Sequence, residues 1–323
     1  MNQTKKKNPL KRLLSMRGMG QVVTVTIGLI VLLVAFALIN PNFWSPTNRT
    51  NLLRQIAPIL IIGIAQSYVL ITGNIDLSIG SVVGMSTMVA ATLMSKGIMS
   101  PIPALLVTLL CCLLIGVLNG LLVAKFKLPP FIATLGTMTV ARGIAQLVNG
   151  NYNTDSIMKF YPEAAQTFKN VFYYGKTLGL YNGIWIAIIL WIVFNFLLSK
   201  TRTGRYIYAT GSNIDAARLS GVNVVSTTVI AYVVSAFCSF VVGIITCATV
   251  GQGTMDAGNS YEMYAVAASV IGGVSTLGGQ GILLGTVVGA AIWGTLQNGL
   301  QFAGAPVAIR NIIIGIIVVL SVL

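Results

Sequence analysis

The chain has 323 residues, of which 55% are hydrophobic and only 8% are charged. Soluble domains carry about 25% charged residues, so this composition predicts a protein that crosses the membrane several times. The 20 Lys and Arg residues outnumber 6 Asp and Glu residues, for a net charge of +14, and no histidine is present. His-ligated haem or zinc and Ser-His-Asp catalysis are therefore excluded, and four cysteines without a C-x-x-C pair predict no metal site.

Ten apolar segments are candidates for membrane helices, because a span needs roughly 20 apolar residues. They lie at 22–39, 56–72, 82–95, 103–123, 131–149, 183–199, 227–250, 262–273, 281–302 and 306–323. The expected fold is all-α, a polytopic membrane protein with about ten transmembrane helices. Residues 1–323 are expected to form a single transmembrane domain.

Two of these segments, 82–95 and 262–273, are too short to cross unaided, and each adjoins a polar run rich in Ser and Gly. The polar runs are 73–81 and 274–280. Irregular backbone at membrane depth is tolerated only where protein buries it or water reaches it. The two runs therefore predict either broken or re-entrant helices around a cavity, or two ordinary cytoplasmic turns.

The distribution of positive charge predicts the orientation. With ten spans and the N-terminus inside, the inner segments carry 12 Lys and Arg residues and the outer segments carry six, as the positive-inside rule expects. A tail at 1–21, a loop at 200–226 and both termini are then cytoplasmic, and a loop at 150–182 is extracytoplasmic. The excess positive charge is explained by this topology, so no nucleic acid is expected as a partner.

Small residues indicate close helix packing. Gly281, Gly285 and Gly289 recur every four residues, a spacing that lets two helix backbones approach in a membrane. At Gly285 we therefore expect a leucine to disrupt the packing and an alanine to be tolerated.

A weak internal repeat divides the chain into two similar halves, 56–149 and 227–323. The run GVLNGL at 116–121 is similar to GTLQNGL at 294–300, and each follows one of the two polar breaks. Structural repeats are common in transporters. Chance similarity between Gly- and Leu-rich segments is the alternative.

Asp76 and Arg142 are the charged residues within predicted membrane segments that most need an explanation. A charge at membrane depth is costly and usually faces a cavity, where Asp76 would hydrogen-bond a polyhydroxylated ligand or coordinate a cation. Alternatively Asp76 lies at the cytoplasmic interface or caps the following helix, with Ser78 as another capping candidate. Arg142 either lines a polar path or extends its side chain to the interface.

The loop at 200–226 contains the signals of a short helix. Asn213 suits the N-cap, Asp215 the first turn, Arg218 the last turn and Gly221 the position just past the end. This helix lacks the large apolar face of an ordinary interfacial helix, which is the alternative, so we expect it to dock on a soluble partner.

Taken together, the motifs resemble those of the permease subunits of bacterial ABC importers for monosaccharides, of the ribose, xylose and galactose type. The resemblance covers nearly the full length. It is carried by TGNIDLSIGS at 72–81, PFIATLG at 130–136, GRYIYA at 204–209, ARLSGV at 217–222, IGGVSTLGG at 271–279 and NGL at 298–300.

The resemblance implies a non-enzymatic, multi-pass subunit of the bacterial inner membrane that forms the pathway for a monosaccharide. Its partners would be a second permease subunit, a cytoplasmic ATPase and an extracytoplasmic sugar-binding protein. This chain would bind no cofactor, because ATP and Mg are bound by the ATPase. The alternatives are a branched-chain amino-acid ABC permease and, from another class, an ion-coupled secondary transporter, for which Asp76 alone is thin support.

The resemblance also implies two sets of site residues. The ATPase-docking residues expected are Gly204, Arg205, Asn213, Asp215, Ala216, Arg218, Leu219, Ser220 and Gly221. The residues expected to line the translocation pathway are Asn74, Asp76, Ser78, Ser81, Thr134, Arg142, Ser275, Thr276 and Asn298.

Overall fold

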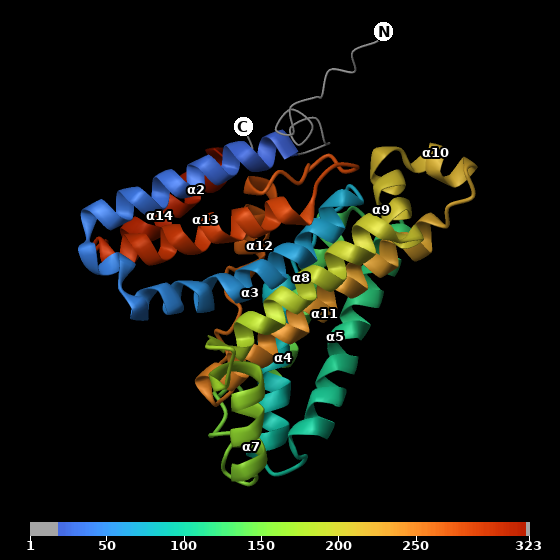
Figure 1. The fold of residues 1–323 in the computed structure, drawn as a ribbon. Coiled ribbons are helices and arrows are strands. Elements are labelled where there is room, and N and C mark those ends of the chain that lie inside the picture. The colour runs from blue at the N-terminus through green and yellow to red at the C-terminus, as the bar shows by residue number, and fades with distance from the viewer. Residues whose placement is uncertain (1–18, 321–323) are drawn as a thin grey trace.

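The computed structural model describes residues 19–320, which form helices, one small hairpin and irregular connecting segments (Figure 1). The helices of the first half are α2 (Met19–Ile39), η1 (Pro41–Trp44), α3 (Pro46–Ile71), α4 (Ile79–Ser95), α5 (Pro101–Ala124) and α6 (Pro130–Leu147). The connecting region holds α7 (Pro162–Lys169), η2 (Asn170–Tyr174), the antiparallel strands β1 (Lys176–Thr177) and β2 (Leu180–Tyr181), α8 (Asn182–Lys200), α9 (Arg202–Ser212) and α10 (Ile214–Leu219). The second half holds α11 (Val224–Val250), α12 (Tyr261–Ile271), α13 (Leu283–Phe302) and α14 (Val307–Leu320).

Each of the ten predicted apolar segments coincides with a helix, which confirms the all-α membrane class. Among the described residues, five helices are long and apolar enough to cross a membrane: α2, α3, α5, α8 and α11. The largest difference is α3, which begins at Pro46 and not at residue 56. The first turns of α3 carry Arg49 and Arg54, which interrupt the apolar pattern of the sequence. The helix nevertheless begins at Pro46, because the Ser45 side chain caps it by accepting a hydrogen bond from the Asn48 backbone N–H at 3.3 Å.

The bundle is built around α3 and α11, and its two ends are formed by different loops. One end, called the α10 end, holds α9, α10 and segment 272–282, and Gly279 N–H donates to the Ile71 carbonyl at 2.8 Å. The other end, called the α7 end, joins the loop after α6 to the loop after α11, since Thr154 N–H donates to the Gly253 carbonyl at 3.0 Å. Figure 1 shows α10 and α7 at opposite extremities of the molecule.

The two halves repeat the same order of elements in opposite directions. A long helix, α3 or α11, is followed by an irregular segment, 72–78 or 251–260, and then by a shorter helix, α4 or α12. Helices α4 and α5 pack on α11, whereas α12 and α13 pack on α3. Since α3 ends at the α10 end and α11 ends at the α7 end, the halves are inverted relative to each other, an arrangement known in transporters.

The glycines of the internal repeat occupy matching places in this arrangement. Gly116 of α5 lies against Ala236 of α11, and Gly294 of α13 lies against Ile56 of α3. One part of the sequence interpretation is corrected: the counterpart of the break at 73–81 is 251–260, which precedes α12. The run at 274–280 follows α12 instead.

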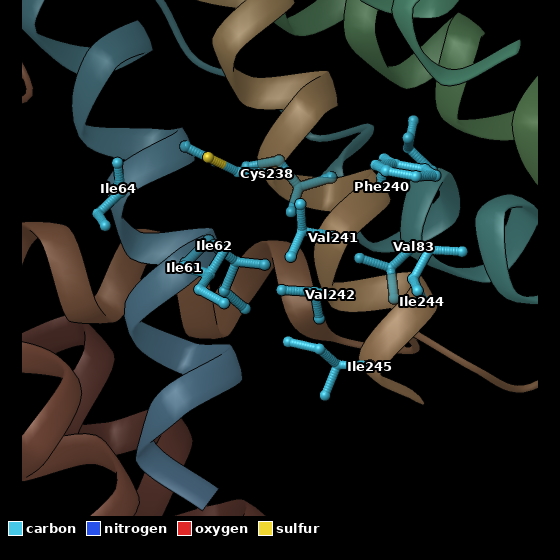
Figure 2. Packing of buried hydrophobic residues seen from close by; sticks show 14 of the residues in the cluster. Ile61, Ile62, Ile64, Val83, Cys238, Phe240, Val241, Val242, Ile244 and Ile245 are labelled. Atoms are coloured by element: carbon cyan, nitrogen blue, oxygen red, sulfur yellow. The ribbon is translucent and has the colours of Figure 1, made fainter. Parts of the chain in front are cut away.

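The core lies between α3, α4 and α11. Figure 2 shows Ile61 and Ile62 of α3 beside Val242 of α11, and all three side chains are fully buried. Lipid is as apolar as these residues, so in a membrane the contact is stabilised by close van der Waals packing and not by the exclusion of water.

The glycines of α13 form a tight contact with α12. A Cβ added at Gly285 would meet the carbonyl of Gly272, and one at Gly289 would meet the carbonyl of Ala268. Gly281 does not belong to this stripe, because α13 begins only at Leu283 and Gly281, with φ of +145°, belongs to the preceding irregular segment.

Candidate functional site

Asp76 lies in the irregular segment before α4 and is almost completely buried, with 2% of its surface exposed. One carboxylate oxygen accepts hydrogen bonds from the backbone N–H and the hydroxyl of Ser78 at 2.8 and 2.6 Å. The other accepts from the Ser235 hydroxyl of α11 at 2.7 Å. A buried carboxyl group is tolerated when it is hydrogen-bonded, and this one accepts from three donors.

The hydrogen bonds continue into two further helices. Asn119 of α5 donates to the Ser78 hydroxyl at 2.9 Å, and Thr137 of α6 donates to the Asn119 side-chain carbonyl at 2.6 Å. We call Asp76, Ser78, Asn119, Thr137 and Ser235 the polar chain. It fastens the start of α4 to α5, α6 and α11 through groups that are all buried.

The structure distinguishes the two residues considered for the cap of α4, Asp76 and Ser78. Ser78, not Asp76, occupies the N-cap position of α4, and it makes no side-chain capping bond. Asp76 instead accepts from the N–H two residues on, an Asx turn that leads into the helix. The segment is partly buried: Thr72, Asp76 and Ser78 are buried, whereas Gly73 is exposed. Sequence reasoning missed Ser235 and Thr137 and noted Asn119 only as part of the repeat.

Four further predicted pathway residues make contacts of their own. Ser81 is fully buried in α4, the Thr134 hydroxyl donates to the Pro130 carbonyl at 2.8 Å, and Asn74 donates to the Thr72 hydroxyl at 2.7 Å. Asn298 of α13 is also buried and exchanges side-chain hydrogen bonds with Asn48 of α3 at 2.9 and 3.1 Å. Asn74 lies in the same irregular segment as Asp76, and the Thr134 carbonyl accepts from the Thr137 hydroxyl of the polar chain at 3.1 Å. Of these four residues, Asn298 lies apart, between α13 and α3.

Ser275 and Thr276 line an open cleft at the α10 end. Two adjoining cavities of about 320 Å³ each form this cleft and share Gln21, Gly273 and Gln280 in their walls. We call it the α9 cleft, because Tyr208 of α9 lines its inner part. Its other lining residues are Val270, Gly272, Val274, Leu277, Gly279, Gly281 and Ile282.

Arg142 holds the loop after α11 against α6. Its guanidinium donates to the carbonyls of Met255 and Ala257, both at 2.9 Å. Gly84 of α4 makes room for this contact, because a Cβ there would lie 2.7 Å from the guanidinium and 2.6 Å from the Ala257 carbonyl. Sequence reasoning did not find this role, since the partners are backbone carbonyls that any residue supplies.

Replacing Arg142 by glutamine should release the 251–260 loop. Two hydrogen bonds from a charged group are lost, each worth about 1.5–3 kcal/mol. We expect Ala257→Cys, which replaces a 7% exposed residue, to react several-fold faster with a membrane-impermeant maleimide in this background. Cys111 is replaced by alanine for the measurement, because the other three native thiols are buried.

The matched control is Arg49→Gln, which removes an exposed arginine from the same end of the molecule. It should leave the labelling of position 257 unchanged. Equal labelling rates in the Arg142→Gln and unsubstituted backgrounds would show that the loop is held by other contacts.

The loop at 200–226 folds into two helices, α9 and α10. The predicted short helix is present as α10: the Asn213 side chain accepts from the Ala216 N–H at 2.9 Å, and Gly221 follows with φ of +82°. Asp215 and Arg218 lie 3.5 Å apart on its surface. Helix α9 takes the place of a predicted loop.

Helix α10 projects from the bundle (Figure 1). Ala217 is its one buried residue, whereas Leu219 is 90% and Ile214 48% exposed. The other predicted docking residues divide between the two helices: Arg205, Ala216 and Ser220 are exposed, and Gly204 is buried against the Leu198 carbonyl of α8. The structure thus presents apolar and charged side chains together on a protruding knob.

Comparisons with known proteins agree on one family. A family model described as "Branched-chain amino acid transport system / permease component" matches residues 48–322. The ribose import permease protein RbsC of Bacillus subtilis strain 168 is 35% identical over 298 residues, covering 92% of this chain and 90% of that protein. The Haemophilus influenzae protein of the same name is 38% identical over 300 residues, with the same coverage.

The galactofuranose transporter permease protein YtfT of Escherichia coli K12 is 36% identical over 319 residues, covering 96% of this chain and 90% of that protein. No solved structure matches the chain significantly. The family model and the relatives match nearly the whole chain, and the fold is all-α with membrane-spanning helices. The chain therefore belongs to the family described as the permease component of the branched-chain amino acid transport system, and it is a polytopic membrane permease.

Proposed function

We propose that this chain forms the translocation pathway for a monosaccharide in an ATP-driven importer of the bacterial inner membrane. The relatives named above are permeases for ribose and galactofuranose, and further relatives at 30–33% identity are named for D-allose and for galactose and methyl galactoside. These names favour a sugar over a branched-chain amino acid, although the family description mentions the latter.

Helix α10 is the observation that carries the ATP-driven mechanism. A polar helix that leaves Leu219 almost fully exposed beside an Asp215–Arg218 pair suits a protein partner. We assign this partner as a cytoplasmic ATPase that binds ATP and Mg, so that this chain binds no cofactor and catalyses no reaction. The α10 end and both termini are then cytoplasmic.

The α7 end would receive the sugar from an extracytoplasmic binding protein, over 150–182 and 251–261. A second permease subunit completes the pathway. Sugar binding along it should be weak, because a conduit must release what it accepts. Movement of the ATPase would reach the membrane helices as a rigid-body displacement of α9 and α10.

Reversing the charges of α10 tests this assignment. Asp215→Lys combined with Arg218→Glu keeps an i,i+3 ion pair on the helix but reverses its signs, which opposes the helix dipole by about 0.3–1 kcal/mol per charge, while the Asn213 cap of the helix is left intact. We expect the ATPase to stop co-purifying and ATP-driven sugar uptake to fall at least tenfold.

A matched control is available at the opposite end. Asp155 and Lys159 form an exposed ion pair at 2.7 Å, and the Lys159 ammonium lowers the pKa of the Asp155 carboxyl below its usual value. Exchanging these two residues should leave ATPase co-purification intact. Wild-type uptake with a bound ATPase in the α10 variant would contradict the docking assignment and favour an interfacial helix.

The ion-coupled alternative is distinguished by measuring sugar uptake in cells that produce the transporter. Depletion of ATP should stop uptake by the proposed importer while an ionophore that only collapses ion gradients should not. Uptake that follows the ion gradient and ignores the ATP level would favour the secondary transporter.

A further inference from the structure

Helix α9 contacts two parts of the permease that lie far apart in the sequence. The Tyr208 hydroxyl donates to the Gly281 carbonyl at 2.6 Å. One turn further along, Gly211 lies directly against the Ile71 carbonyl at the end of α3. The same carbonyl accepts from the Gly279 N–H at 2.8 Å, so α9, the end of α3 and segment 272–282 meet at one place.

Segment 272–282 is bonded to α12 at its start, where the Gly273 and Val274 N–H groups donate to the carbonyls of Val270 and Ser269 at 2.8 and 3.0 Å, and it has little regular structure beyond that. Gly273, Gly278, Gly279 and Gly281 all have positive φ, at +89°, +86°, +70° and +145°. Its internal backbone hydrogen bonds include Ser275 N–H to the Gln280 carbonyl at 3.0 Å. Glycines permit several backbone conformations at small steric cost, so the outside contacts determine where the segment lies.

The α9 cleft gives the segment room to move. The cleft lies between the start of α2, α9 and the segment itself, and the Tyr208–Gly281 bond spans its inner wall. Beyond Gly281 the chain enters α13, whose Gly285 lies against the backbone of Gly272, the residue at which α12 ends and the segment begins. A displacement of Gly281 therefore reaches the α12–α13 contact within two turns.

We propose that the Tyr208 hydroxyl is a positioning group that couples movement of the α9–α10 unit to segment 272–282 and hence to α13. The inference rests on the proposed function in that the ATPase supplies the movement. Burial raises the pKa of Tyr208 to about 12, so the hydroxyl remains a donor at every physiological pH. Replacing it by phenylalanine removes the bond and keeps the ring in place.

The first test uses the purified full-length permease without any partner. A nitroxide spin label is attached at Leu277→Cys, an 89% exposed site on the segment, with Cys111 replaced by alanine. We expect Tyr208→Phe to increase the mobility of the label. Tyr68→Phe is the control, because it also removes a hydroxyl bound to a carbonyl, that of Phe194 at 2.7 Å, but in the core between α3 and α8.

Unchanged spectra in Tyr208→Phe, or an equal change in Tyr68→Phe, would overturn the proposal. In the first case the bond does not position the segment, and in the second any lost hydrogen bond has the same effect. This test is independent of the ATPase, so it stands even if the α10 charge reversal disproves docking.

The second test uses the complete transporter. Tyr208→Phe should keep its ATPase and continue to hydrolyse ATP, but the sugar imported per ATP should fall several-fold, whereas Tyr68→Phe should keep the wild-type ratio. A wild-type ratio in Tyr208→Phe would overturn the coupling role. Loss of ATPase co-purification would overturn it too, because Tyr208 would then serve docking.

Discussion

Replacing Asp76 by alanine should abolish sugar uptake and lower the melting temperature of the purified protein more than any other single change in the polar chain. The substitution leaves the Ser78 N–H, the Ser78 hydroxyl and the Ser235 hydroxyl without their acceptor. A buried donor without a partner costs about 1–3 kcal/mol. The start of α4 would also lose its connection to α11.

The asparagine variant separates the hydrogen bonds from the charge. Its side-chain carbonyl can still accept from both donors of Ser78, and its amide can donate to the Ser235 hydroxyl, which is able to accept. We therefore expect Asp76→Asn to keep a substantial part of the stability and uptake. Ser235→Ala, which removes one bond only, should fall between asparagine and the wild type.

Thermal unfolding and sugar uptake of the three variants are measured side by side. If asparagine is as damaging as alanine, the negative charge itself is required. The polar chain would then not be the main role of Asp76, and a cation or a proton at this position would be the better explanation.

The positions of the helices could be predicted from the sequence because lipid imposes a length and an apolar composition on each span. The start of α3 was missed because Arg49 and Arg54 break the apolar pattern before the bundle buries the helix. Helix α9 was missed because Gly204 and Gly211 favour loops by propensity. Both glycines are instead required by close approach, to α8 and to the end of α3.

Only part of the candidate site could be predicted. Asp76 and Ser78 stood out because a carboxylate is rare in an apolar region. Ser235 gave no such signal, because serines in membrane helices commonly bond to their own helix, as Ser239 does to the Ser235 carbonyl. Its bond to Asp76 joins residues 159 positions apart, and such a pairing follows only from the packing of α4 on α11.

The inverted relation of the halves explains why the breaks were paired incorrectly. In the sequence the two breaks were paired by composition, since 274–280 and 73–81 are both rich in Ser and Gly. In the structure the matching segments are those in equivalent positions: 251–260 follows α11 as 72–78 follows α3. Both of these segments are clamped from outside, one through Asp76 and the other through Arg142, so a similar architecture is stabilised by different side chains.

Gly285 provides the second large effect, and the structure changes what is expected of it. The sequence predicts that alanine is tolerated there, as in an ordinary contact of small residues. In the structure the nearest atom to an added Cβ is the Gly272 carbonyl oxygen, followed by the Gly272 backbone carbon at 2.9 Å. Backbone cannot rotate aside like a side chain, so even one methyl group must separate α13 from α12.

Gly285→Ala should therefore be destabilised by about 1–3 kcal/mol, the usual cost of overpacking, despite the gain in helix propensity. Gly285→Leu should fail to assemble with its partners and should lose uptake. The matched control is Gly143→Ala in α6, where nothing lies within 4 Å of the added Cβ. The control should be as stable as the wild type or slightly more stable.

Thermal unfolding in detergent and size-exclusion chromatography of the assembled transporter decide the matter. Equal melting temperatures for Gly285→Ala and Gly143→Ala would mean that α12 and α13 are not held at backbone contact. That result would also weaken the coupling route through Gly281, because a displacement of α13 reaches α12 only where the two backbones touch. A lower melting temperature for Gly285→Ala but not for Gly143→Ala would instead show that α13 is held at backbone contact with Gly272. Gly272 itself lines the α9 cleft.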